Sequence, residues 1–466
     1  MADMINVYST VTQAEGFRLE AEASTLLGTR YFPNGAGDNF VTSEVLFDYE
    51  DEDLKRGVFV TRGYKGTNTT AYTANTALPP RIGHSDTVDP MNFDRIQFER
   101  LVRMHSEDGS RAPDLMDLAY LKSARLARRE DRSIEILIAL ILKNGGIDFD
   151  QEKTPGSADT DHINLWFYDL DKGCNNHVLV PKAWGEPDAH PYDDVCKMVS
   201  EGRKRGRKHK DLLLGENAWQ HLSNDEKFMK FAGKTFHSEG MAIDFGEIDG
   251  ATHVAKAVFN GVQLDVLVYS GAYENEDGEL VNYIDPDAVI LISPEVGRTL
   301  CGGVCLLNDN VSYDLANAIA QMKGKHIQHL YKDFYNQILM IRSESRPLPA
   351  PKHSVNAFDW IYMECSQESP TGDYAVGEVA NGVVFDQDPD KTWASDCECT
   401  ADVVLAGEPV DITLGEVTGE TVELFAVKGG KPFGTPLDTT GDHITIPAGN
   451  DKDADGNYVI WATSRA

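Results

Sequence analysis

One long predicted helix is the feature that most constrains how this chain can fold. Pro113 stands where the helix would begin, and Gly145 and Gly146 stand where it would end, the usual positions of these residues at helix termini. At about 1.5 Å per residue the helix would be roughly 45 Å long. An apolar stripe at helical spacing runs along its second half, which predicts one buried face. The stripe consists of Ile134, Leu137, Ile138 and Ile141.

Four arginines share one face of the same predicted helix. They are Arg125, Arg128, Arg129 and Arg132. Like charges three and four positions apart are mildly destabilising when nothing neutralises them. Such a stripe is usually a solvated face, and the alternative is that it meets an acidic partner.

Residues 264–273 and 283–293 are two runs rich in β-branched residues that flank the sequence NEDG at 275–278. Two such runs around a glycine-containing loop predict an antiparallel β-hairpin.

The first 40 residues have weak periodicity and predict an extended arm with one candidate helix at about 12–27. Alternating segments at 45–49 and 58–62 then predict a two-stranded ribbon within residues 45–93. A ribbon of this kind is marginal by itself and must lie against other structure. The alternative is a surface hairpin of a compact domain.

The middle of the chain predicts mixed α/β structure, followed by a small all-β domain. Helices are expected at 193–204, 218–222 and 313–335, strands at 254–270, 283–292, 338–342 and 359–365, and a short buried segment at 211–214. The proline-rich sequence RPLPAP at 346–351 predicts a stiff extended connector. After about residue 367, short alternating runs between Gly, Pro and Asp turns predict a β-sandwich.

Composition limits the class of protein. The chain has 466 residues and a formal net charge of −32, so we expect about two to four domains and no general nucleic-acid-binding surface, which would need a basic face. No apolar run approaches the roughly 20 residues of a membrane-spanning helix, and the first residues do not have the pattern of a signal peptide. Seven scattered cysteines favour a reducing compartment over a disulfide framework.

The motifs that might carry chemistry are weak. Cys301 and Cys305 with His326 and His329 have ligand types suited to zinc, but their spacing departs from zinc-finger patterns. The sequence DKDADG at 451–456 begins like a calcium loop, yet Ala462 stands where the twelfth-position Glu belongs. The basic run at 202–210 is explained by the end of the preceding helix, with nucleic acid or an acidic partner as the alternative.

Sequence signatures of nucleophile elbows, phosphate loops and dinucleotide sites are absent. We therefore predict a protein that is not an enzyme, with no catalytic residues, no cofactor and no metal.

Several short strings in a fixed order carry a resemblance to a known family. They are RGYKG at 62–66, VYSGAY at 268–273, YIDPDAV at 283–289, RTLCG at 298–302 and the connector at 346–351. Over residues 1–370 the chain resembles the major capsid proteins of tailed bacteriophages, specifically the group of the phage lambda major head protein.

The resemblance implies an α+β fold of the Hong Kong 97 phage capsid type. Residues 1–44 would be the N-terminal arm, 45–99 the extended loop, 100–187 with 346–370 the peripheral domain containing the long spine helix, and 188–345 the axial domain. Residues 371–466 depart from the lambda pattern and are expected to form an added immunoglobulin-like β-sandwich.

The resemblance also implies assembly rather than catalysis. Hexamers and pentamers of this chain would build an icosahedral head around double-stranded DNA, without sequence-specific binding and without a membrane. Scaffold and portal proteins, and possible decoration proteins, would be partners, and assembly would occur in the host cytoplasm. An encapsulin-type compartment shell is the alternative with the same fold, and a metal-dependent hydrolase and a glycan-binding adhesin are more distant alternatives.

An acidic run precedes the expected loop, and it could neutralise the arginines of the long helix. It comprises Asp48, Glu50, Asp51, Glu52 and Asp53. We expect this run and the stripe Arg125, Arg128, Arg129 and Arg132 to pair between subunits. Single exposed pairs are worth only about 0–1 kcal/mol, but the contact would repeat over many interfaces.

Overall fold

The computed structural model of the 466-residue chain describes residues 25–50, 72–88, 115–152, 160–168, 176–229, 246–248, 250–275, 278–304, 323–333, 338–368, 375–377, 379–388, 398–399, 404–407, 409–413, 421–438, 443–447 and 449–465.

The predicted long helix is confirmed. Helix α3 (Leu115–Asn144) has 30 residues, and all four members of its apolar stripe are buried. Gly145, with φ of 73°, follows the last helical residue, as is common where a helix ends in the left-handed region. The chain then enters β4 (Gly146–Glu152), which pairs antiparallel with β5 (Thr160–Trp166).

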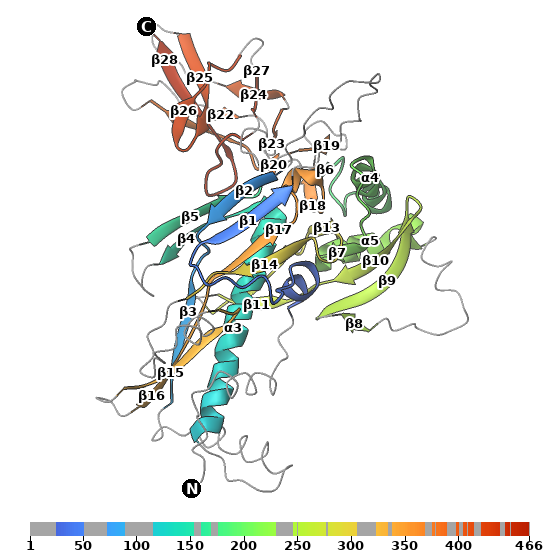
Figure 1. The fold of residues 1–466 in the computed structure, drawn as a ribbon. Helices are drawn as coiled ribbons and strands as arrows, with labels where there is room; N and C mark the ends of the chain where they lie inside the picture. Colours follow the sequence, from blue (N-terminus) through green and yellow to red (C-terminus); the bar gives the residue numbers. More distant parts are fainter. Residues whose placement is uncertain are drawn as a thin grey trace, which may run out of the picture.

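An eight-stranded sheet with the order β19-β6-β18-β13-β7-β10-β9-β8 lies beside the upper part of α3 (Figure 1). Its strands are β6 (His177–Val180), β7 (Asp211–Leu214), β8 (Glu247–Ile248), β9 (Ala251–Phe259), β10 (Val262–Val268), β13 (Ala288–Ile292), β18 (Ile361–Glu368) and β19 (Ala375–Val376). The sheet takes strands from the segments expected as the peripheral and axial domains and, in β19, from the start of the segment expected as the C-terminal domain.

The central strands of this sheet are covered on both faces. Leu212 and Leu214 pack in one core with α4 (Pro191–Lys204) and α5 (Glu216–Asn224), whereas Leu213 packs in a second core with α3. Successive side chains of a strand point to opposite faces. A strand that is buried at every position, as β7 and β13 are, therefore needs cover on both sides.

The prediction of one long hairpin over residues 264–293 is wrong, because its two apolar runs do not pair with each other. Strand β7 lies between β10 and β13, parallel to β10 and antiparallel to β13. Only the short strands β11 (Ala272–Glu274) and β12 (Leu280–Asn282) form a hairpin around the predicted turn. Each of the two apolar runs can bury both of its faces when it lies beside β7 in the centre of the sheet. Pairing of the runs with each other in an isolated hairpin would not provide this burial.

A three-stranded sheet with the order β15-β16-β3 lies along α3 (Figure 1). It consists of β3 (Ile82–Val88), β15 (Ile327–Asp333) and β16 (Ile338–Ser345). The helix expected over 313–335 is therefore wrong for Ile327–Asp333, and residues 313–322 lie outside the described residues. Pairing with the adjoining strand β16, which itself pairs with the distant β3, overrides the local helical reading, as is common for short apolar segments.

The predicted strand at 45–49 is present and pairs with a segment that the sequence analysis did not single out. Strands β1 (Val45–Glu50) and β2 (Tyr72–Ala77) pair antiparallel, and the expected strand at 58–62 lies outside the described residues. The proline-rich connector is extended as predicted and forms β17 (Pro347–Pro351), paired with β14 (Gly297–Cys301). Pairing on one side only suits prolines, which have no N–H to donate.

Every element described after residue 378 is a strand, in agreement with the all-β prediction. They are β20 (Val379–Ala380), β21 (Val383–Gln387), β22 (Glu398–Cys399), β23 (Val404–Leu405), β24 (Pro409–Thr413), β25 (Thr421–Lys428), β26 (Lys431–Phe433), β27 (His443–Thr445) and β28 (Tyr458–Arg465). They form small sheets of four, three and two strands around a separate core that includes Leu424 and Ile460. Figure 1 shows this unit at one end of the molecule.

The described part of the expected arm is packed rather than loose. A single π-helical turn, η1 (Leu27–Tyr31), lies against α3. Leu26, Leu27, Tyr31 and Phe32 are all fully buried. Among the described residues, no helix combines the length and apolar character needed to cross a bilayer.

Candidate assembly surface

The outward side of α3 carries the arginine face, defined as Arg125, Arg128, Arg129 and Arg132. Arg125, Arg129 and Arg132 are exposed, and Arg128 is half-buried and takes part in a further interaction. Among the described residues no carboxylate forms an ion pair with any of the three exposed arginines. Unneutralised cations at helical spacing favour binding of an acidic partner.

The acidic run, residues 48–53, is not brought to these three arginines within the described part of the chain. Asp48 and Glu50 lie on β1, opposite Ala74 and Tyr72 of β2. Asp51, Glu52 and Asp53 lie outside the described residues.

An apolar groove of about 500 Å³ continues the arginine face toward the C-terminal end of α3. Ile136, Ala139 and Leu140 line one wall, and the β11–β12 hairpin lines the other. Leu280 on that hairpin is 79% exposed, which is unusual for a leucine and marks a surface suited to apolar contact.

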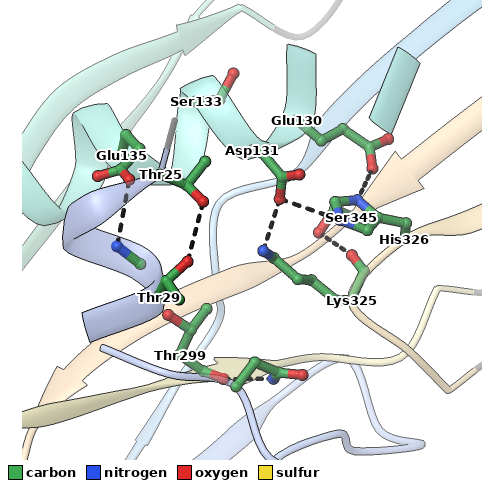
Figure 2. A network of polar contacts seen from close by, with 12 residues as sticks. Thr25, Thr29, Glu130, Asp131, Ser133, Glu135, Thr299, Lys325, His326 and Ser345 are labelled. Carbon is green, nitrogen blue, oxygen red and sulfur yellow. Dashed lines mark hydrogen bonds and ion pairs between the residues drawn. The ribbon is translucent and has the colours of Figure 1, made fainter. Parts of the chain in front are cut away.

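The opposite side of α3 holds buried acids that the sequence analysis did not single out. His326 Nδ1 lies 2.5 Å from Glu130 Oε2, and His326 Nε2 lies 3.2 Å from Asp131 Oδ1 (Figure 2). Lys325 Nζ lies 2.6 Å from the same Asp131 oxygen. These contacts fix the segment before β15 to the middle of α3.

The charges in this cluster support one another. Burial alone would lower the pKa of His326, but its hydrogen bonds to Asp131 and Glu130 outweigh burial and raise that pKa. Burial alone would raise the pKa of Asp131, but His326 and Lys325 lower it to about 2. The cluster therefore sets two basic side chains against two acidic ones, which is the usual condition for burying ionisable groups.

The metal alternative does not fit these positions. Both ring nitrogens of His326 face carboxylates, and Cys301 is buried beneath the arm, where Asn34 Nδ2 lies 3.6 Å from its sulfur. Cys305 lies outside the described residues. Within the described part of the chain, no group of three or more His, Cys, Asp or Glu residues could hold a metal ion.

Further contacts attach α3 to the three-stranded sheet. Lys122 Nζ lies 3.0 Å from Asp86 Oδ1 on β3, and Ser123 forms a hydrogen bond with Gln328 on β15. At the far end of β16, the buried Glu344 accepts a 2.8 Å hydrogen bond from Arg81 Nε. Because Arg81 lies between β2 and β3, this ion pair anchors the base of the ribbon.

The basic run at 202–210 is largely used by the chain's own fold. Arg205 lies 4.3 Å from the ring centroid of Phe358, and Arg207 Nε donates to Ala357 O at 2.9 Å. His209 is buried and its ring contacts Phe358 O at 2.9 Å. These contacts favour a structural role for the run over a nucleic-acid-binding one.

The calcium-like loop is organised by its own side chains. Asp453 Oδ1 accepts hydrogen bonds from the backbone N–H groups of Asp455 and Asn457 at 3.0 and 2.9 Å. A turn closed in this way is a common use of Asp between strands.

Comparison with known proteins gives one family match. The family model described as phage major capsid protein E matches residues 9–354 of the chain. No curated protein matches it.

Several solved structures are also similar. A protein of an E. coli CFT073 prophage described as its capsid protein is 16% identical, with 77% of this chain and 99% of that chain covered and a TM-score of 0.46. A phage-related protein from Bordetella bronchiseptica RB50 is 12% identical, with 77% and 97% covered and a TM-score of 0.41. The capsid of Ralstonia phage GP4 is 11% identical, with 71% and 85% covered and a TM-score of 0.36.

Proposed function

The chain belongs to the phage major capsid protein E family of virion structural proteins, and we propose that it self-assembles into the hexamers and pentamers of an icosahedral head. The head would enclose packaged double-stranded DNA. The observation that carries the proposal is the family match over residues 9–354. The three exposed arginines of α3, which have no ion-pair partner among the described residues, and the apolar groove beside them are the kind of surface that such a subunit needs for its neighbours.

We propose that the chain is divided into domains as in the lambda-type head protein, which has the Hong Kong 97 phage capsid fold. Residues 1–44 are the N-terminal arm, 45–99 the extended loop, 100–187 with 346–370 the peripheral domain and 188–345 the axial domain. Residues 371–466 add an immunoglobulin-like domain. The antiparallel β1–β2 base, held by Arg81 and Glu344, suits a loop that reaches out from the subunit.

The same proposal includes partners. Scaffold and portal proteins would direct assembly in the host cytoplasm, and decoration proteins are a further candidate. The chain itself would act without catalysis, and its net charge of −32 would keep packaged DNA from adhering to the shell.

Between subunits, we propose that the acidic run of one copy neutralises the arginine face of the next. The three exposed arginines lack an ion-pair partner among the described residues, and the run 48–53 supplies five carboxylates. Contacts of this heterologous kind repeat around a closed ring.

The direct test is velocity sedimentation followed by negative-stain electron microscopy of the expressed full chain, with its scaffold protein where available. Closed shells tens of nanometres across would support the proposal. A monomer or small oligomer with scaffold present would contradict it. Shells that enclose a protein cargo and never take up DNA through a portal would instead identify a compartment shell.

A further inference from the structure

Glu135, in the middle of α3, caps the first turn of the packed arm. Its Oε1 accepts hydrogen bonds from the backbone N–H groups of Leu27 and Gly28, at 3.1 and 3.4 Å (Figure 2). The first N–H groups of a helical turn have no partner within the turn. The N-cap residue Leu26 makes no side-chain hydrogen bond to this turn. The Glu135 carboxyl, 108 positions from Leu27 and 107 from Gly28 in the sequence, therefore acts as its cap.

The second oxygen of the same carboxyl lies in the interior without a hydrogen bond from the described residues. Glu135 is 1% exposed, and its Oε2 is buried with no hydrogen-bond partner among the described residues. An ionised carboxylate in that position has neither water nor a donor on one oxygen, which is costly in a protein interior.

Among the residues that the structure describes, no cation forms an ion pair with Glu135. The charged groups that act on its carboxyl are Lys325 before β15 and Asp131 on α3, and Lys325 is already paired with Asp131. Tyr283 also interacts electrostatically with Glu135 and with Arg132. From η1 come only backbone N–H groups.

We propose that Glu135 is a proton-controlled latch for the entry turn of the arm, residues 25–29. With the proton bound, one oxygen accepts both N–H groups and the site holds no net charge. When the proton leaves, the buried charge is relieved by opening of the turn, which admits water to the carboxylate. The Arg30 ion pair with Asp211 holds the residues that follow, so the opening is confined to residues 25–29.

The sign and range of the effect follow from the local chemistry. Burial raises the pKa of Glu135 from 4.5 to about 8, against the opposing hydrogen bonds from Gly28 and Leu27. A group whose folded-state pKa is raised contributes stability that is complete below the unfolded value and is lost as pH rises toward the folded value. The latch is therefore closed in mild acid and loosens between pH 4.5 and 8.

Hydrogen exchange of the full chain, read by mass spectrometry from pH 5 to 9 and corrected for intrinsic rates, tests the latch. Protection of peptides covering residues 25–31 should fall at least tenfold between pH 5 and 8, relative to peptides covering β13. Glu135→Gln keeps the acceptor oxygen and removes the charge, so its protection should stay constant over that range. The matched control Glu216→Gln, at an exposed position in the first turn of α5, should behave as the wild-type chain.

Two results would overturn the proposal. One is constant protection of 25–31 in the wild-type chain, which needs no variant to fold. The other is the same pH response in Glu135→Gln as in wild type. Because His326 also has a raised pKa, peptides covering residues 323–333 provide an internal reference that should still respond in Glu135→Gln. The latch does not depend on the assembly proposal, since the exchange is measured on the subunit.

Discussion

The guanidinium of Arg30 forms a two-point ion pair with the carboxylate of Asp211, with Nε and Nη2 at 2.7 and 3.0 Å from its two oxygens. Tyr31 donates its hydroxyl to the same carboxylate at 3.2 Å, and the Asp211 side chain is fully buried. Asp211 is the first residue of β7, so the pair ties the arm to the centre of the main sheet.

Replacing Arg30→Ala should lower the free energy of unfolding of the subunit by about 3 kcal/mol, because a buried carboxylate loses its cation. Arg30→Lys should restore only part of the loss, since an ammonium cannot make the two-point contact. Urea denaturation of the unassembled subunit measures both. The control Arg298→Ala removes a mostly exposed arginine 3.6 Å from Asp38 and should cost under about 1 kcal/mol. Equal losses for Arg30→Ala and Arg298→Ala would contradict the assignment.

Trp360 should be the side chain of the main core least tolerant of truncation. It is fully buried, and its indole N–H donates to Leu142 O at 3.0 Å near the end of α3. Trp360→Phe removes the donor and leaves a void, so we expect a loss of about 2–4 kcal/mol in thermal or urea unfolding. Trp219→Phe, at a half-buried position on α5, should lose clearly less, and the reverse order would count against this packing.

His177 should make the subunit sensitive to acid. Burial, together with the charge of Lys452, lowers the pKa of His177 to about 3, although a hydrogen bond with Lys143 O opposes the shift. The stability contributed by the neutral ring is present above the unfolded pKa of 6.5 and is lost as pH falls toward 3. His177→Gln should flatten the fall of melting temperature between pH 6.5 and 4, whereas His190→Gln, at an exposed position, should leave it unchanged. A wild-type melting temperature that is constant over that range would refute the prediction.

Reversing the charge of arginines on α3 should reduce assembly of shells without a large change in the stability of the folded subunit. Arg125→Glu with Arg129→Glu, both at exposed positions, should reduce the yield of shells in sedimentation while the melting temperature of the subunit changes little. Reversal of Asp48, Glu50, Asp51, Glu52 and Asp53 to lysine in the same chain should recover the yield. The control pair Lys428→Glu with Lys431→Glu lies outside the family-matched residues and should leave the yield unchanged. Normal assembly of the arginine variant would exclude the proposed pairing.

Local sequence determined the elements whose signals are local. Helix α3 has a terminating glycine and an apolar stripe that can be read from spacing alone, and both are found in the structure. The extended connector at β17 and the strand-only character after residue 378 follow equally from prolines, turns and alternation. The order of short strings was enough to recognise a phage capsid protein, which the family match bears out.

Tertiary structure alone decided which elements meet. Nothing in residues 264–293 indicates that β7, some 50 positions earlier, would separate the two runs. Glu130, Asp131 and Glu135 have the spacing of ordinary helix-surface charges, yet residues 325–326 and the turn at Leu27 cover them. The physical reason is that the periodicity of a sequence specifies only which face of a helix or strand avoids water. The partner that covers this face depends on contacts between residues far apart in the chain, and so do the pKa shifts that burial then causes.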